Sequence, residues 1–280
     1  APPEGMIGLT SLSNGILAGF KDNEVMFCEP FMPHAWPTKY RMSTDYPIVG
    51  IKAVGSSLIV TTKAYPYVAQ GAHPSNMTLA RMRENQSCVS KRSIVGMGHS
   101  VMYASPDGLI SAAGNIATLA TEKVYSRAQW QAMKPETIHG YMHEGSYVGF
   151  YTVSGVQKGF IFNPKSLLLS DLTDVTTLTG GYANPEDDAL YFIDNVSQIK
   201  QFNAGTDSTY EWQSKQYKVG RPMNMAAARV EAESYSNITL YVYAESGLVH
   251  TQTVLNERAF RLPSGYRSNQ YEVKVVGSDI

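Results

Sequence analysis

The sequence is poor in charge, in cysteine and in long apolar runs. Charged residues make up 17% of the chain, below the roughly 25% that is usual for soluble domains. Lys plus Arg number 23 and Asp plus Glu number 24, without a long run of either sign, so the composition does not indicate a dedicated nucleic-acid-binding surface. No apolar stretch approaches the roughly 20 residues of a membrane-spanning helix, and we expect none. The start at Ala1-Pro2-Pro3-Glu4 lacks a basic and apolar leader and is interpreted as a processed or excised terminus.

Cysteine is nearly absent as well. Cys28 and Cys88 lie in separate β-like segments without the CxxC or Cys/His spacing of a metal site. We expect two small buried thiols, a common role of free cysteine, and the sequence leaves a disulfide between them open. The GxSxG elbow, the Walker-type phosphate loop and the HExxH motif are also missing. We therefore predict a non-enzymatic protein with no catalytic residue, no cofactor and no metal site.

Residues typical of strands and turns are abundant. The chain contains 18 Tyr and 23 Gly, and apolar and polar residues alternate with a period of two between Gly, Asn, Asp and Pro turns. Five such units start about 35 to 45 residues apart, the spacing of propeller blades. Each carries a strand with a Gly followed by an apolar or aromatic residue. The units cover residues 15–29, 48–68, 93–113, 137–163 and 177–202.

This pattern predicts an all-β fold, a propeller-like array of about five small antiparallel sheets. One small sheet cannot bury both of its faces, whereas stacked sheets cover one another. After Arg221-Pro222 the strands become longer and more regular, which indicates a small C-terminal β-sandwich. The predicted domains are residues 1–219 and 220–280.

Helical patterns are rare. One short helix is expected at Ser126–Met133, with Ser126 as its N-cap and with Trp130 and Met133 facing inward. A weaker pattern predicts a second helix at Pro74–Arg83.

Three segments contain residue types that carry chemistry elsewhere, but each has a simpler structural interpretation. His139 and His143 stand four apart, as helical metal ligands do, yet the surrounding Tyr and Gly residues favour strand and turn. Ser105-Pro106-Asp107-Gly108 is partly similar to the aspartate turn of sialidase propellers, and we interpret it as a turn in which Pro fixes φ and Gly takes a positive φ. Glu186-Asp187-Asp188 is interpreted as a solvated loop.

The densest aromatic patch is the candidate interaction patch. It consists of Pro33, His34, Trp36 and Tyr40. Prolines on both sides of Trp36 fix the backbone, so the simpler interpretation is a rigid loop clamped by its aromatic ring against the next sheet. The functional interpretation is a platform for stacking sugar rings, to which Tyr65 would also belong.

Several motifs are shared with a known family. They are Gly8–Phe20, Glu29–Pro37, Cys88–Ser93, Tyr103–Leu109, Gln129-Trp130 with Lys134-Pro135, and Phe260–Arg267. Taken together, these segments resemble a family of short-tailed bacteriophage virion proteins, described as tail, tail-tube or nozzle-like structural proteins. The similarity covers most of residues 5 to 275. It implies a component of the phage tail without catalytic residues, preceded by a sizeable N-terminal region whose strands would complete the propeller.

We therefore predict a virion protein that forms a six-fold nozzle or tube ring with copies of itself, next to other tail proteins and in transient contact with phage DNA. The near-neutral charge fits such an ejection conduit, because a strongly basic wall would hold phosphates tightly. Two alternatives stay open. One is a host-surface glycan-binding module at the tail tip, and the other is a depolymerase of capsule polysaccharide, which would need two suitably spaced carboxylates.

Overall fold

The computed structural model describes residues 1–172, 175–205 and 209–278. Within these ranges the chain is nearly all β, as predicted, and it is built from several small antiparallel sheets. The described helices are all short, and none of them has the length and apolar character needed to cross a membrane.

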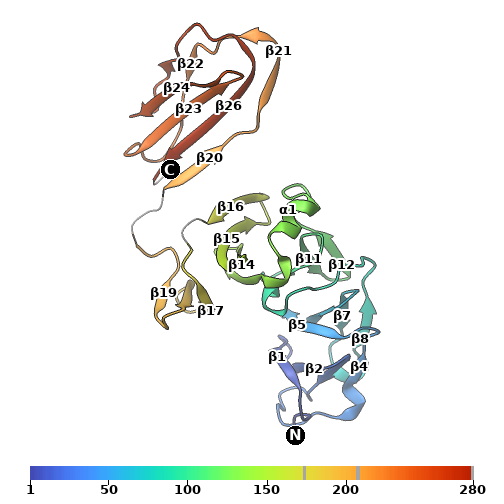
Figure 1. The fold of residues 1–280 in the computed structure, drawn as a ribbon. Coiled ribbons are helices and arrows are strands. Elements are labelled where there is room, and N and C mark those ends of the chain that lie inside the picture. Colours follow the sequence, from blue (N-terminus) through green and yellow to red (C-terminus); the bar gives the residue numbers. More distant parts are fainter. Residues whose placement is uncertain (173–174, 206–208, 279–280) are drawn as a thin grey trace. The chain divides into compact units, whose positions relative to one another are not determined.

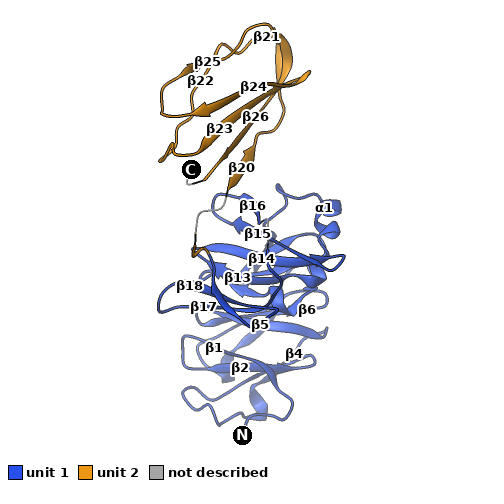
Figure 2. Ribbon diagram, turned by 60° about the vertical axis from the view of Figure 1, so that its left-hand side comes forward, with its two compact units in different colours: residues 1–202 blue, residues 203–280 orange. Residues whose placement is uncertain are grey.

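The chain forms two compact units, and their boundary differs from the expected one. The units are residues 1–202 and 203–280 (Figure 2), whereas the pattern suggested a division after residue 219. The boundary in the structure lies nearer the N-terminus than the predicted one because β20 (Tyr210–Gln213) and β21 (Tyr217–Met223) both pair with the last strand of the second unit.

Unit 1 is a propeller-like array of five sheets, each a meander of consecutive antiparallel strands (Figure 1). Sheet 1 consists of β1 (Ile7–Ser11), β2 (Leu17–Lys21), β3 (Glu24–Phe27) and β4 (Arg41–Ser43). Sheet 2 consists of β5 (Ile48–Val54), β6 (Ser57–Thr62), β7 (Tyr67–Gln70) and β8 (Thr78–Arg81). Sheet 3 consists of β9 (Val95–Gly96), β10 (Val101–Ala104), β11 (Leu109–Ala113) and β12 (Ile116–Leu119). Sheet 4 consists of β13 (His139–His143), β14 (Ser146–Val153), β15 (Val156–Asn163) and β16 (Leu168–Leu172). Sheet 5 consists of β17 (Leu178–Asn184), β18 (Ala189–Asp194) and β19 (Ile199–Gln201).

The interior sheets bury both of their faces, because successive side chains of a strand point to opposite sides. In β6, Leu58 and Val60 pack in the cluster shared with sheet 1, and Ile59 between them packs in the cluster shared with sheet 3. In β14, Tyr147 packs toward sheet 3 and Phe150 packs toward sheet 5. Each completely buried side chain of this size contributes about 1.5–3 kcal/mol, so the sheets stabilise one another.

Buried clusters connect consecutive sheets only. One cluster each joins sheets 1 and 2, 2 and 3, 3 and 4, and 4 and 5. Among the residues that the structure describes, no buried cluster joins sheet 5 back to sheet 1. The array is therefore open, with one end face on sheet 1 and the other on sheet 5.

The first strands of the sheets contact one another in chain order, which places β1, β5, β9, β13 and β17 at the common inner edge. In four of the five units the recurring glycine lies in one of these strands, as Gly50, Gly96, Gly140 or Gly181. A Cβ at Gly50 would overlap the Cδ1 atom of Ile94, and a Cβ at Gly181 would lie 2.8 Å from the ring of Tyr141 in the neighbouring sheet. A side chain at either position would therefore displace neighbouring side chains at the inner edge.

Among the described residues, one α-helix is present, and it forms where the sequence predicted it. α1 spans Arg127–Ala132, and the hydroxyl oxygen of Ser126 accepts a hydrogen bond from the backbone N–H of Gln129, which completes a capping box. Trp130 is buried and donates its indole N–H to the carbonyl of Ser105 at 2.8 Å.

The prediction of a second helix over residues 74–83 is wrong. Its first residues form the 3₁₀ turn η2 and the rest forms strand β8, because that segment pairs with β7 at the edge of sheet 2. The four 3₁₀ turns are η1 (Thr38–Tyr40), η2 (Pro74–Asn76), η3 (Lys91–Ser93) and η4 (Pro135–Thr137).

Unit 2 is a small two-layer β domain. Its main sheet has the order β20-β26-β23-β24, with β21 also paired to β26. The second layer contains a two-stranded sheet of β22 and β25, and these strands are short, unlike the longer strands expected after Arg221-Pro222. Leu240 and Val242 of the main sheet share a buried cluster with Leu262 of the second layer. The remaining strands are β22 (Ala227–Ala228), β23 (Ile238–Ala244), β24 (Gly247–Val254), β25 (Phe260–Arg261) and β26 (Ser268–Gly277).

The packing between sheets can be tested with a matched pair of isoleucines. Ile59 is completely buried between sheets 2 and 3, whereas Ile116 is 63% exposed. We expect Ile59→Ala to lower the free energy of unfolding by about 2–5 kcal/mol, because it removes apolar contacts and leaves a cavity. Ile116→Ala is the control and should change it by less than about 0.5 kcal/mol. Urea unfolding followed by near-ultraviolet circular dichroism measures both, and equal effects would contradict the stacked-sheet packing.

Candidate functional site

The candidate interaction patch lies on a compact loop between β3 and η1. The backbone N–H of Glu29 donates to the carbonyl of Ala35 at 2.8 Å, and the N–H of Ala35 donates to the carbonyl of Met32 at 2.9 Å. The Phe31 N–H donates to the Gly15 carbonyl at 2.9 Å, which ties the loop to the preceding hairpin. The loop is therefore held by backbone hydrogen bonds, both within itself and to the preceding hairpin.

The predicted patch residues divide between the surface and the interior. Pro33 and His34 are exposed. Trp36 is half-buried, and its indole N–H donates to the Pro33 carbonyl at 2.8 Å, within the loop. Tyr40 is only 3% exposed and belongs to the core between sheets 1 and 2, so it does not contribute to the surface patch.

The sequence analysis missed the most exposed apolar residues of this loop. Phe31 is 82% exposed and adopts a positive φ of 59°, and Met32 is 49% exposed. A bulky residue with positive φ is strained, and such strain persists where the surroundings enforce it. The signal was present in the sequence, since both residues stand between two prolines. We call Phe31, Met32, Pro33 and His34 the loop tip.

A second notable region is the segment Cys88–Ser93, which we call the hub segment. It contacts sheets 2 and 3 through its backbone and one hydroxyl. The Cys88 N–H donates to the carbonyl of Thr62 at 2.9 Å, and the Val89 N–H donates to the carbonyl of Ala104 at 3.0 Å. Ser93 is buried, and its hydroxyl oxygen accepts a hydrogen bond from the Ala104 N–H at 2.8 Å.

The hub segment also reaches the other three sheets. Toward sheet 4, the Ser90 hydroxyl donates to the carbonyl of Ile138 at 2.6 Å, and the Tyr147 hydroxyl donates to the Ser93 carbonyl at 2.9 Å. Arg92 Nη2 donates to the carbonyl of Thr179 in sheet 5 at 2.8 Å. Lys91 Nζ lies 5.7 Å from the ring centroid of Phe20 in sheet 1. One six-residue stretch thus touches all five sheets, which local sequence patterns do not reveal.

Beside the hub segment a small groove separates β1 from β5. Its volume is about 180 Å³, and Lys52 and Lys91 both line it. Both lysines are exposed, and neither forms an ion pair with any residue that the structure describes. The groove therefore carries positive charge that the protein does not neutralise.

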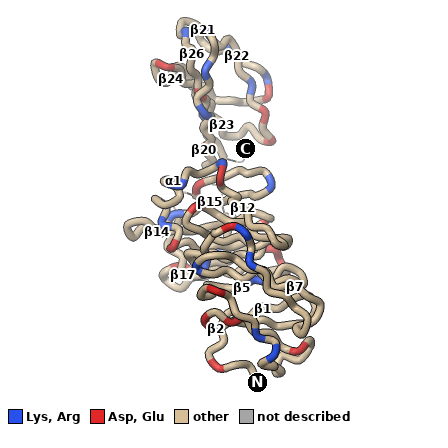
Figure 3. Tube along the Cα trace, turned by 90° about the vertical axis from the view of Figure 1, so that its right-hand side faces the viewer, with Lys and Arg blue, Asp and Glu red and all other residues tan. Residues whose placement is uncertain are grey.

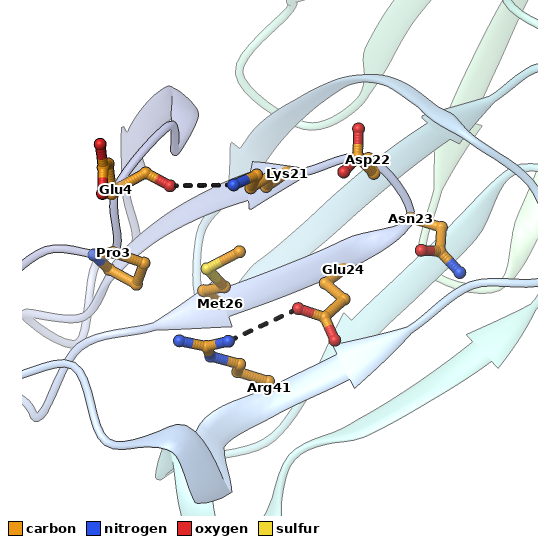
Figure 4. Close-up of a pocket in the computed structure, with 8 residues that line it drawn as sticks. All are labelled: Pro3, Glu4, Lys21, Asp22, Asn23, Glu24, Met26 and Arg41. Atoms are coloured by element: carbon orange, nitrogen blue, oxygen red, sulfur yellow. Dashed lines mark hydrogen bonds and ion pairs between the residues drawn. The ribbon is translucent and has the colours of Figure 1, made fainter.

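A larger pocket of about 400 Å³ lies on the end face of sheet 1 (Figure 4). Both of its basic side chains have partners within the pocket. Arg41 forms an ion pair with Glu24 at 3.7 Å, and Lys21 Nζ donates to the Glu4 carbonyl at 3.3 Å. Figure 3 likewise shows basic and acidic positions interspersed along the chain. We assign no ligand to this pocket.

The two histidines that stand four apart lie on strand β13, in agreement with the simpler interpretation. The ring of His139 stacks on Phe150 with 5.4 Å between centroids, and the ring of His143 packs edge-on against Phe202. No cluster of three or more His, Cys, Asp and Glu residues that could hold a metal occurs in the described ranges. Burial lowers the pKa of His139 to about 4, and the nearby Arg92 guanidinium contributes in the same direction.

The turn at residues 105–108 forms as expected, but its glycine has another role. The Ser105 N–H donates to the Gly108 carbonyl at 2.9 Å and closes the turn. Gly108 does not have the positive φ that was predicted. A Cβ at this position would instead overlap Thr121 Oγ1 and would lie 2.6 Å from Leu119 Cδ1, so close packing excludes a side chain.

Cys28 and Cys88 are both free and buried, as expected. Burial raises the pKa of the Cys88 thiol to about 11. Cys88 packs among the apolar residues between sheets 2 and 3.

Comparisons with known proteins do not assign the chain to a family. No family model matches the sequence, and no curated protein matches it. PorZ, an essential bacterial surface component of the type-IX secretion system of Porphyromonas gingivalis, shares 10% identity at a TM-score of 0.45, over 92% of this chain and 40% of PorZ. The acylaminoacyl peptidase of Pyrococcus horikoshii shares 7% identity at a TM-score of 0.44, over 76% of this chain and 42% of the peptidase.

The Pan2 WD40 domain of Neurospora crassa shares 10% identity at a TM-score of 0.40, over 98% of this chain and 89% of that domain. The chain spans less than two thirds of the length of PorZ and of the peptidase. At these identities and scores the similarities carry no argument about family or activity.

The connection between the hub segment and sheet 4 can be tested with Tyr147→Phe. This change keeps the buried ring but removes the hydroxyl that donates to the Ser93 carbonyl. We expect a loss of about 1–3 kcal/mol in the free energy of unfolding, because the buried carbonyl loses its donor. Tyr182→Phe, on the exposed face of sheet 5, is the control and should stay within about 0.5 kcal/mol. Chemical denaturation compares the two, and equal effects would argue against the contact.

The lowered pKa of His139 predicts how the free energy of unfolding depends on pH. The folded protein holds this imidazole neutral down to about pH 4, whereas the unfolded chain protonates it near the ordinary value of 6.5. The free energy of unfolding should therefore fall as the pH is lowered from 6.5 toward 4, because the unfolded state binds the additional proton. His139→Gln should show a flatter pH dependence in urea denaturation over this window, and an unchanged slope would contradict the assignment.

Proposed function

We propose that the chain is a non-enzymatic structural component of a bacteriophage tail, a part of the nozzle or tube ring through which DNA leaves the particle. In this proposal it contacts copies of itself and other tail proteins in the virion. The sequence resemblance suggests this role, and the observations below are compatible with it.

Three of the motifs that carry the resemblance form parts of the structure that hydrogen bonds hold in place. Glu29–Pro37 forms the rigid loop with the exposed tip, and Cys88–Ser93 is the hub segment. Tyr103–Leu109 forms the turn that receives the hydrogen bond of Trp130 in α1. These motifs therefore serve packing and surface presentation, which are the tasks of a scaffold protein.

The observation that carries the proposal is the loop tip. Its apolar side chains point outward from a loop whose backbone is fixed by hydrogen bonds, so little conformational entropy is lost when a partner covers them. Exposed aromatic and Met side chains are enriched at protein interfaces. A rigid, exposed Phe31 with Met32 beside it is therefore suited to contact a neighbouring protein.

A second apolar surface lies on the end face of sheet 5. Tyr182, Ile193 and Ile199 are all exposed there, while Leu190 and Phe192 of the same sheet pack against sheet 4. Two separate apolar surfaces on one unit are what a subunit with several neighbours requires.

The rival function, glycan binding at the tail tip, has less support. Sugar stacking needs an exposed aromatic face, but Tyr40 is buried, and the ring of Tyr65 has the Arg81 guanidinium 4.7 Å from its centroid. Trp36 alone remains as a half-buried platform. Glycan-array binding that is lost in Trp36→Ala would favour this rival.

The decisive experiment is an image of the complete virion at side-chain resolution. We expect density for this chain within the tail, in a ring around the DNA channel. Density for the chain elsewhere in the particle, or its absence from purified particles, would reject the proposal.

Incorporation into particles also tests the loop tip. We expect the double variant Phe31→Ser, Met32→Ser to fold but to be depleted from purified particles at least about tenfold, because burial of two such side chains contributes several kcal/mol at an interface. Leu255→Ser changes an equally exposed apolar residue of unit 2 and is the control. Quantitative mass spectrometry of particles measures both, and normal incorporation of the double variant would speak against the loop tip as a contact.

A further inference from the structure

The groove between β1 and β5 combines several features of an anion site. It lies at the inner edge of the array, between Gly8–Thr10 of β1, Gly50–Lys52 of β5, and the hub segment. Its lining contains two lysines and no acidic residue. The groove is small, about 180 Å³, and both lysines belong to its lining.

The two lysine side chains are positioned by contacts along their stems. Lys91 Nζ lies 5.7 Å from the ring centroid of Phe20, a cation–π contact that holds the ammonium group beside the groove. Lys52 runs along Gly96, where an added Cβ would lie 3.0 Å from Lys52 Cε. Glycine at position 96 thus leaves space for the lysine stem.

The β1 wall of the groove is irregular. The register of β1 with β2 shifts between Ile7 and Thr10, and such a shift interrupts the regular ladder of backbone hydrogen bonds at the wall of the groove. Arg92 follows Lys91 in the hub segment, but its guanidinium donates to the Thr179 carbonyl of sheet 5, and Arg92 does not line the groove.

We propose that this groove binds a phosphate group, with the ammonium groups of Lys52 and Lys91 as its principal ligands. A tetrahedral phosphate offers several strong acceptor oxygens, and lysine binds it as a point charge. The phosphate belongs either to a nucleic-acid backbone or to a small phosphate anion. The site is independent of the proposed tail function, since it requires only unit 1.

The test measures two ligands against matched variants of the full chain. Inorganic phosphate is titrated and followed by phosphorus NMR, and a fluorescent DNA duplex is titrated and followed by anisotropy at several salt concentrations. The variants are Lys52→Gln, Lys91→Gln and their combination. Lys63→Gln removes the same charge at an exposed turn beyond β6 and is the control. Near-ultraviolet circular dichroism checks folding, and the two single variants carry the comparison if the double variant unfolds.

We expect each single variant to weaken binding about threefold to tenfold, and the control to stay within about twofold. With duplex DNA, each lysine removed should also lower the slope of log affinity against log salt by about 0.9. Binding of DNA alone identifies a backbone phosphate as the ligand, and binding of inorganic phosphate identifies a small anion. The proposal is overturned if the unsubstituted chain binds neither ligand, or if Lys63→Gln weakens binding as much as Lys91→Gln does.

Discussion

Each interior sheet of unit 1 must cover two apolar faces, and only neighbouring sheets can cover them. The alternation of Leu58, Ile59 and Val60 between two clusters shows the constraint at the level of single residues. Glycines lie in the inner-edge strands where neighbouring sheets approach closely, and one connecting segment runs beside these strands. That segment, Cys88–Ser93, satisfies its polar groups on the surrounding strands. The hub is thus a consequence of mutual burial.

The strands could be predicted because their signals are local. Alternation with a period of two and turn residues marked all five units, and Ser126 as an N-cap marked α1. Contacts between distant residues could not be predicted in this way. Nothing local shows that Tyr40 enters a core, that Arg92 reaches Thr179, or that β20 joins the second unit. Gly108 illustrates the same limit, since its neighbour Thr121 lies in another part of the chain.

The two candidate contact surfaces, the loop tip and the outer face of sheet 5, are not covered by the packing between sheets. The loop tip projects from the side of sheet 1, and the outer face of sheet 5 has no described sheet against it. The phosphate groove differs from both, because it is polar and lies at the inner edge. Overall charge near zero therefore conceals a local pair of cations, and the composition alone did not indicate a dedicated surface for phosphate.

The hub segment also affects how unit 1 would respond to force. An array joined only through consecutive interfaces would come apart one sheet at a time when it is stretched, as linear repeat proteins do. Here the bonds of Ser90, Ser93 and Arg92 tie sheets 3, 4 and 5 to one central strip of backbone. Pulling sheet 5 away from the array requires the hydrogen bond between Arg92 and the Thr179 carbonyl to break. An applied force is therefore shared among several sheets.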